Sequence, residues 1–358
     1  MTSPALLKTF AAFLMILSFG GCKDVPKLQE PPTDKRTSIP RVRGNAIYHW
    51  KTVFNLNEDE IAFLSSHSVR KMYVRFFDVD VETSPMNATN SAIPIGTTAF
   101  KSPRPSNIEI VPTVFITVKS LVSTKEEEID DLASKIYTRV CNMADYNDLG
   151  AIREIQLDCD WTNSTQDLFY LLCEKIAHLA HADSLFVSST IRLHQLKMDP
   201  PPVDQGVLMV YNTGALRETG TKNSILDYDD VKTYLSCKSI HYDLPLDFAF
   251  PTYGWGVMFR NGVYNGILHK TDFSDETRYK KGKEGTFVVK KDHVLEGRSL
   301  WKGDVIRMEY PTADEVKKVA ELVVSSVQDS THSVILYHLD ANNLLKYTDD
   351  EISSIYGY

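Results

Sequence analysis

Short apolar runs alternate with helix-like patterns along most of the chain. Eight runs have the length and the β-branched or aromatic content of strands. Between most of them, apolar residues recur three or four positions apart, as Leu168, Leu172 and Ile176 do, which is the spacing of an amphipathic helix. Strands separated mostly by helices predict an α/β fold, the (β/α)8 or TIM barrel. The strands are expected at residues 47–54, 71–79, 108–118, 154–161, 185–193, 206–211, 246–253 and 333–339.

The connections add detail to this barrel, whose domain is expected to span residues 41–358. No helix is visible after the fifth strand, because prolines occupy positions 200–202. Residues 256–311 form a long polar connection rich in glycine and lysine, and we expect an excursion there between the seventh and eighth strands. Helices are expected at 58–67, 123–145, 165–182, near 228–237 and at 312–327, the last with Thr312 as its N-terminal cap and Glu315 three residues later.

The N-terminus has the pattern of a signal segment. Lys8 precedes an apolar run over residues 10–19, and two glycines precede Cys22. The run is too short to span a bilayer, which needs about 20 apolar residues, so it is typical of a cleaved signal peptide. The arrangement resembles the bacterial lipobox, in which small residues precede a cysteine that is lipidated, although Phe19 stands where that pattern usually has Leu, Val or Ile. The resemblance implies a signal peptide over 1–21 and lipid on Cys22.

A polar segment follows this cysteine. Residues 22–40 contain four prolines and lack an apolar face, as a flexible tether does. We therefore expect an exported protein, anchored through its lipid to a membrane of the cell envelope, the outer membrane. The alternative is an ordinary signal peptide followed by an incidental cysteine.

Composition and charge narrow the function classes. The chain is 43% hydrophobic and 24% charged, so it can bury a sizeable core. Its net charge is −8 and no dense basic cluster is present, which argues against nucleic acid as a partner. No HxH, HExxH or CxxC pattern occurs, so neither a metal nor another cofactor is expected. Buried free thiols, with disulfides as the alternative, are expected at Cys141, Cys159, Cys173 and Cys237.

The fourth strand, EIQLDCDWT, carries the most informative pattern. Two carboxylates, Asp158 and Asp160, alternate with apolar residues, and the polar set is expected to face the barrel interior and climb to its mouth, where such barrels have their active sites. Neighbouring carboxylates in a low dielectric raise one pKa and create an acid beside a base, so Asp158 and Asp160 are candidate catalytic residues. A structural acceptor inside the barrel is the alternative role. The apolar face comprises Ile155, Leu157, Cys159 and Trp161, and the polar face Glu154, Gln156, Asp158, Asp160 and Thr162.

Other strand ends supply aromatic and polar side chains that suit a carbohydrate. Sugar C–H faces stack on aromatic rings, and sugar hydroxyls need polar partners. A glycosidase normally needs a second carboxyl, for which Asp80, Glu309 and Asp340 are candidates. The candidate substrate-binding residues at these ends are Trp50 from the first strand, Arg192 from the fifth, Tyr253 and Trp255 from the seventh, and His338 and Asp340 from the eighth.

The fourth strand also resembles a known signature. Family-18 glycoside hydrolases, the chitinase family, carry D-x-x-D-x-D-x-E there, and Asp158 and Asp160 match its second and third acids. Ile155 stands in place of the first acid and Thr162 in place of the catalytic Glu. Because threonine cannot act as a general acid near neutral pH, the family's mechanism does not carry over intact.

A second match lies on the sixth strand. The family has M-x-Y-D there, and this chain has Met209, Tyr211 and then Asn212 in place of the aspartate. In the family this Tyr and Asp help to hold the substrate acetamido group, so the resemblance implies that Tyr211 and Asn212 belong to the pocket. The chain also resembles bacterial barrel lipoproteins that keep the strand-four acids and lack the glutamate.

Three functions fit these patterns. The first is a membrane-anchored, glycoside hydrolase-like barrel that acts on or binds an oligosaccharide or polysaccharide. The second is a non-catalytic carbohydrate-binding lipoprotein that has lost the general acid, and the third is a structural lipoprotein with a vestigial pocket. A second carboxyl converging on Asp160 would favour the enzyme.

Overall fold

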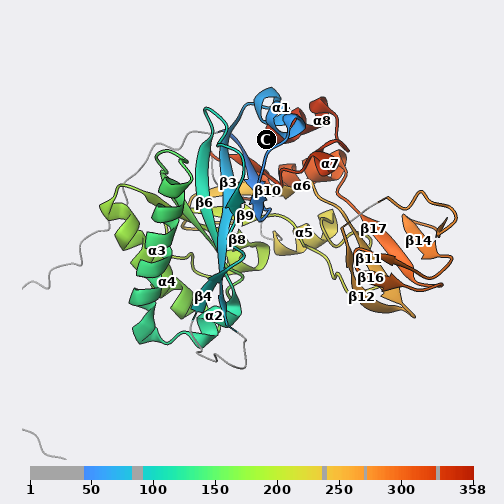
Figure 1. Ribbon diagram of the computed structural model, residues 1–358, viewed down its shortest axis with the longest axis horizontal. Helices are drawn as coiled ribbons and strands as arrows, with labels where there is room; N and C mark the ends of the chain where they lie inside the picture. The colour runs from blue at the N-terminus through green and yellow to red at the C-terminus, as the bar shows by residue number, and fades with distance from the viewer. Residues whose placement is uncertain (1–43, 83–91, 236–239, 270–271, 328–330) are drawn as a thin grey trace, which may run out of the picture. The chain divides into compact units, whose positions relative to one another are not determined.

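Eight parallel strands close into a barrel in the computed structural model (Figure 1), which describes residues 44–82, 92–235, 240–269, 272–327 and 331–358. The barrel closes because β1 pairs in parallel with both β3 and β18. Every neighbouring pair is parallel, which confirms the predicted TIM barrel. The eight strands, each overlapping one predicted run, are β1 (Asn45–His49), β3 (Val69–Val81), β6 (Glu109–Ile116), β7 (Glu154–Asp158), β8 (Phe186–Arg192), β9 (Gln205–Met209), β10 (Leu246–Pro251) and β18 (Val334–Tyr337).

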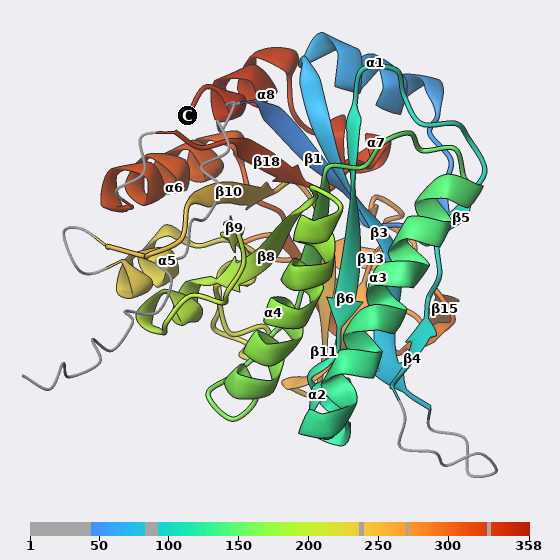
Figure 2. The ribbon, with the colours of Figure 1, turned by 90° about the vertical axis from the view of Figure 1, so that its left-hand side faces the viewer.

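Helices cover the outside of this barrel, and α3 and α4 lie side by side there (Figure 2). Side chains cap several of them; Thr312 accepts from the backbone N–H of Glu315, as predicted. After β8 the chain makes only a 3-10 turn, η2 (Leu193–Lys197), before the prolines. The helices are α1 (Glu58–Ser66), α2 (Val118–Ser123), the 3-10 turn η1 (Glu126–Glu128), α3 (Ile129–Tyr146), α4 (Gln166–Ala182), α5 (Tyr228–Tyr234), α6 (Ala313–Ser326), α7 (Ala341–Leu344) and α8 (Asp349–Tyr356).

The barrel strands have an apolar cluster on each of their two faces. The larger one lies between strands and helices and contains the apolar set of β7. A smaller cluster fills the barrel interior, where the polar set of β7 joins it: Tyr48 donates to Gln156 (2.7 Å) and Lys71 donates to Glu154 (2.7 Å). The alternation predicted for the fourth strand is therefore confirmed. The interior cluster consists of Ala46, Tyr48, Tyr73, Val111, Val207, Met209, Ala249 and Ile335.

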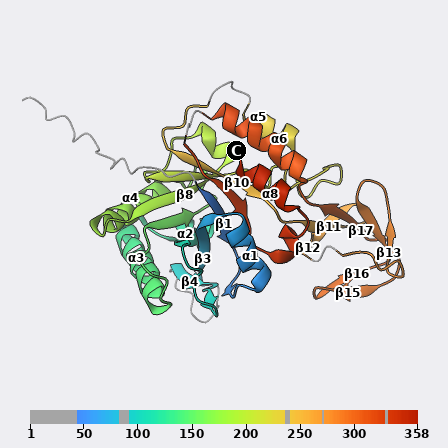
Figure 3. The ribbon, with the colours of Figure 1, turned by 90° about the horizontal axis from the view of Figure 1, so that it is seen from above.

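Between β10 and α6 the chain forms a five-stranded antiparallel sheet and a two-stranded hairpin, which we call the antiparallel lobe (Figure 3). Its own core includes Met258, Phe273 and Ile306. Its sheet has the order β12 (Val263–Leu268), β11 (Trp255–Arg260), β17 (Val305–Glu309), β14 (Thr286–Val289) and β13 (Tyr279–Lys281), and the hairpin is β15 (His293–Leu295) with β16 (Arg298–Leu300).

Short strands complete the described part of the chain: β2 (Val53–Phe54), β4 (Ala92–Ile95) and β5 (Ala99–Phe100). The predicted signal peptide, Cys22, the whole predicted tether and Cys237 lie outside the described residues. Within the described ranges, every helix is too short or too polar to cross a membrane.

Candidate functional site

Asp158 lies at the carboxyl end of β7, almost fully buried. Its Oδ1 accepts from the hydroxyl of Thr190 at 2.6 Å and from Nη2 of Arg192 at 3.2 Å; both donors belong to the neighbouring β8. Burial raises the pKa of Asp158, against the opposing effects of Arg192 and Thr190. The side chain is thus a hydrogen-bonded acceptor at the top of the barrel interior.

Asp160, two residues further on, opens toward solvent, with 56% of its side chain exposed. Its Oδ1 accepts from Nε of Arg192, so the same guanidinium binds both strand-four carboxylates. The geometry fits the planar fork of arginine, which presents several donors at once. Arg192, predicted to bind substrate, is therefore first a partner of Asp158 and Asp160.

Tyr211 and Asn212 follow β9, and both contact Tyr253, which lies just after β10. Tyr211 lies beside Arg192 and Asp158, and burial raises the pKa of its hydroxyl. Its ring meets that of Tyr253 edge-on at 6.0 Å, and the Tyr253 hydroxyl donates to Asn212 Oδ1 at 2.6 Å. Asn212 adopts a left-handed backbone conformation (φ 56°), which asparagine tolerates better than most residues. The structure thus brings together the two residues of the second motif and Tyr253.

These side chains surround a small cavity of about 220 Å³ at the barrel mouth. Four predicted site residues, from the ends of three strands, contribute to it. The cavity can hold part of a sugar ring against both charged and aromatic groups. It is lined by Asp160, Arg192, Leu193, His194, Met209, Tyr211, Asn212, Thr213 and Tyr234.

Trp255 connects the mouth to the antiparallel lobe. Its ring meets that of Tyr253 at 5.3 Å, and its indole N–H donates to Glu309 Oε2 at 2.8 Å. Glu309 is buried and also accepts from the backbone N–H of Ser224 (3.0 Å) and from Nε of Arg307 (2.6 Å). A carboxylate with this many donors fixes the lobe to the loop before α5, and it is poorly placed to act as a catalytic base.

The other candidate second carboxylates also have local partners in the part of the chain that the structure describes. Asp80 accepts from the Thr117 hydroxyl at 2.9 Å. Asp340 caps α7 and pairs with Lys51 Nζ at 3.1 Å. Neither shares a hydrogen-bond or ion-pair partner with the Asp160 side chain among the described residues; the carboxylate that does is Asp158, through Arg192, and Asp78 adds a further negative charge near Asp158.

Tyr337, at the end of β18, is the aromatic hub of the mouth, and sequence reasoning missed it. Its ring lies 4.8 Å from Tyr211, 5.7 Å from Tyr253, 5.4 Å from Tyr48 and 6.0 Å from Trp50. The available signal was alternation along the strand: two residues earlier, Ile335 lies in the barrel interior.

The polar pair, His338 and Asp340, forms a different cluster. His338 interacts electrostatically with Asp340, Lys51 and Glu60, and its burial lowers its pKa to about 4. Lys51 Nζ also binds the buried Glu60 at 2.7 Å. The structure therefore separates these two predicted substrate-binding residues from the cavity at Asp160, whereas Trp50 reaches the aromatic hub through Tyr337.

The other groups that could carry chemistry are metal-binding side chains and cysteine thiols. Within the described ranges, no group of three His, Cys, Asp or Glu side chains comes together as a metal site would require. Cys141, Cys159 and Cys173 are free thiols, and burial raises the pKa of Cys159 and Cys173.

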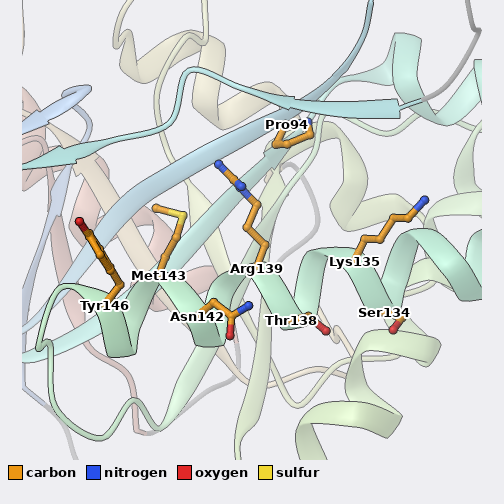
Figure 4. Close-up of a pocket in the computed structure, with 8 residues that line it drawn as sticks. All are labelled: Pro94, Ser134, Lys135, Thr138, Arg139, Asn142, Met143 and Tyr146. Carbon is orange, nitrogen blue, oxygen red and sulfur yellow. The ribbon is translucent and has the colours of Figure 1, made fainter.

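A larger hollow, about 650 Å³, lies between α3 and the end of β4, where Pro94 faces the helix (Figure 4). Its charged residues already have partners: Lys135 binds Asp131 at 2.6 Å, and Arg139 donates to the Thr97 hydroxyl at 2.8 Å. We therefore place the candidate site at the barrel mouth, where polar groups converge in a smaller space. The hollow is lined by Pro94, Ser134, Lys135, Thr138, Arg139, Asn142, Met143 and Tyr146.

Comparison with known proteins identifies the fold. No protein-family model and no curated protein matches the sequence. The structure resembles the chitinase from Chromobacterium violaceum ATCC 12472, with a TM-score of 0.52 and 11% identity over 88% of this chain and 98% of that one. It also resembles the Group IV chitinase of Ostrinia furnacalis, with a TM-score of 0.50 and 10% identity over 88% of this chain and all (100%) of that one. The protein therefore has a chitinase-like (β/α)8-barrel fold.

Proposed function

We propose that this protein is an exported, lipid-anchored carbohydrate-binding protein whose barrel mouth holds an N-acetylhexosamine-containing oligosaccharide without cleaving it. Two observations carry the proposal: Arg192 binds both strand-four carboxylates, and Thr162 occupies the position of the family's general acid. The Thr162 hydroxyl lies 3.0 Å from that of Ser164 in an exposed turn. Glycosidic cleavage normally needs one carboxyl group to donate a proton and another to act as base or nucleophile.

The rest of the mouth suits binding. Two aromatic rings, those of Tyr211 and Tyr234, line the cavity, and Tyr211 is backed by the rings of Tyr253 and Tyr337. Rings of this kind stack on the C–H faces of sugars. Asp160 is exposed and Asn212 lines the cavity, so both can contact sugar hydroxyl or acetamido groups. Because the solved structures with this fold include chitinases, chitin oligosaccharides are the first probe.

The anchor is part of the proposal and follows from the sequence around Cys22. Lipid on this cysteine and the polar segment that follows it would hold the domain at the cell envelope, in the outer membrane. Replacing Cys22 with Ser should abolish incorporation of a radiolabelled fatty acid. Undiminished labelling of this variant would remove the anchor from the proposal.

Binding is tested on the Cys22→Ser protein, which is otherwise full length. A glycan array and titration with chitin oligosaccharides should show binding, and chromatography of the same mixtures should show no product release. Asp160→Asn should weaken the binding. Product release that is lost in Asp158→Asn or Asp160→Asn would replace the binder with a hydrolase, and absence of any binding would refute both.

Hydrolysis is the second candidate, and one observation favours it. Burial raises the pKa of Asp158, and a carboxyl with a raised pKa can keep a proton closer to neutral pH. Thr162→Glu separates the two functions, because it restores a carboxyl at the position of the family's general acid. Cleavage by this variant alone supports the binder, and cleavage by the unmodified chain supports Asp158 as the acid.

A further inference from the structure

A second cavity, of about 410 Å³, lies at the end of the barrel opposite the mouth. Its walls are the second half of α1, the turn that leads into β3 and the segment that precedes β6. β3 and β6 are parallel and both begin at this end, where α1 also lies (Figure 2). The cavity is therefore separate from the site at Asp160.

The charged residues in the lining of this cavity are both positive. Arg70 and Arg104 belong to the lining and no Asp or Glu does, although the net charge of the chain is −8. Arg70 pairs with no acidic side chain in the described ranges. Glu109, which follows the cavity segment directly, interacts with Lys71 and Arg153 instead. The cavity therefore favours an anionic ligand.

Serine hydroxyls add hydrogen-bond donors to the same lining. Ser102 Oγ accepts from the backbone N–H of Leu56 at 3.1 Å, so the hydroxyl hydrogen of Ser102 can be donated to a ligand. Ser68 has a left-handed backbone (φ 51°) just after α1, where glycine is usual, and it contributes a hydroxyl that glycine would lack. Guanidinium and hydroxyl groups together match the oxygens of a phosphate group.

Arg104 is held in place before any ligand binds. Its Nη1 donates to the Ile108 carbonyl at 3.4 Å, and its guanidinium packs against the backbone at Gly150, where a Cβ atom would lie 3.0 Å from Nη2. Glycine at this position leaves room for that approach. A side chain that is already positioned loses less conformational entropy when it binds an anion.

The cavity also has an apolar part. Leu64, Val69 and Ile108 are buried in its floor, and Ile61 is 48% exposed at its edge. Inorganic phosphate has no group that would contact these side chains. A phosphate that carries glycerol and acyl chains would bury apolar surface against them.

The chain enters the barrel beside this cavity. Asn45, the first residue of β1, pairs with Val69, and its side chain donates to the His67 carbonyl at 2.6 Å. Lipid on Cys22 would keep this entry point near the membrane. The ten residues before Asn45 also include four basic and no acidic side chains: Lys35, Arg36, Arg41 and Arg43.

We propose that this cavity binds the phosphate group of an anionic phospholipid in the membrane that carries the anchor. The inference rests on the anchor in the proposed function and is independent of glycan binding. Arg70 and Arg104 bind the phosphate oxygens, and the apolar floor contacts the glycerol and the first carbons of the acyl chains. The mouth at the other end of the barrel then faces away from the membrane.

The experiment measures binding of dihexanoyl phosphatidylglycerol, below its micelle concentration, to the Cys22→Ser protein by calorimetry. Arg70→Gln and Arg104→Gln should each weaken binding about fivefold, as expected for a basic residue at an anionic lipid headgroup. Ile61→Gln should weaken binding of this lipid and leave binding of inorganic phosphate unchanged. Arg298→Gln removes an exposed arginine of the lobe and is the matched control, with less than about twofold change expected.

Each outcome decides one part of the inference. Losses in Arg298→Gln equal to those in Arg70→Gln and Arg104→Gln would indicate a general charge effect and overturn the site. Inorganic phosphate that binds as tightly as the lipid, with no effect of Ile61→Gln, overturns the phospholipid as the ligand. If Arg104→Gln unfolds, Arg70→Gln decides alone. Binding of the soluble lipid by a protein whose Cys22 takes up no fatty acid would keep the cavity as a site and remove the anchor.

Discussion

Two clusters in this barrel have the same composition, one cation between two carboxylates. In the first, Arg192 binds Asp158 and Asp160. In the second, Lys51 binds Glu60 and Asp340. The first borders a cavity and leaves Asp160 more than half exposed, whereas in the second Glu60 is only 1% exposed.

The difference lies in what the partners do besides pairing. Glu60 completes a capping box with Asn57 at the start of α1, and Asp340 caps α7, so Lys51 fastens two helices to the end of β1. Around Arg192 the neighbours are Tyr211 and the open cavity, and Asp160 has a free face. In the proposed function, ion pairs of one composition therefore serve recognition in one place and architecture in the other, and their exposure separates the two roles.

Arg192→Ala should have the largest effect. It leaves Asp158 buried without its cation, which typically costs about 3–5 kcal/mol of unfolding free energy. The same change should abolish detectable glycan binding, because the cavity loses its positive wall. Urea unfolding and titration with chitin oligosaccharides measure the two effects. Arg192→Lys, which keeps the charge and loses the fork, is the control; unchanged stability in Arg192→Ala would refute the pairing.

Lys51→Met should destabilise the fold by about 2–3 kcal/mol, because Glu60 then stays buried without a counter-charge. Lys51 is itself one third exposed (34%), and solvent screening keeps the loss below that of Arg192→Ala. Affinity for glycan should not change. A drop in affinity comparable with that of Arg192→Ala would show that the two clusters are not functionally distinct.

Acidification should weaken the fold through the second cluster. Burial lowers the pKa of His49 to about 3 and that of His338 to about 4, from an ordinary value of 6.5. Below pH 6.5 these two histidines therefore bind protons in the unfolded chain but stay neutral in the folded chain. Their contribution to the free energy of unfolding is complete above pH 6.5 and is lost as the pH falls toward 4. For His49 alone, going from pH 7 to pH 5 should cost about 2 kcal/mol.

Thermal unfolding at pH 7 and pH 5 tests this, with His49→Asn as the variant that should flatten the slope. Asp158 acts in the opposite direction, because burial raises its pKa and the folded chain then takes up its proton first. A wild-type protein that is equally stable at both pH values, with no response to His49→Asn, would contradict the assignment.

Asp160→Asn should have the smallest effect on stability, below about 0.5 kcal/mol, since an exposed ion pair contributes little. The same substitution should weaken glycan binding more than it weakens the fold. The expected loss of affinity is about tenfold or less, because a charged hydrogen-bond acceptor is removed. Calorimetry measures the affinity and urea unfolding the stability. Asp183→Asn, on the surface after α4, provides a distant control.

The fold was largely predictable, and the site only in part. The strand-four alternation predicted which side chains enter the barrel, because successive residues of a strand point to opposite faces. Tyr211, Asn212 and Asp160 meet as the two motifs imply. The partners of each charged side chain were not predictable. No local pattern in the sequence indicates that Arg192 binds both aspartates. Nor does one indicate that the Glu309 carboxylate accepts hydrogen bonds from Ser224, Trp255 and Arg307.

The sequence by itself determined the barrel, the order of its strands and the residues at their carboxyl ends, since these depend on periodicities of two and of about 3.6 residues. Only the tertiary structure decided that Tyr337 is the hub of the mouth and that His338 and Asp340 belong to the cluster around Lys51. These depend on contacts between residues far apart in the chain, where small differences in side-chain direction decide which groups meet. Local patterns carry no record of those differences.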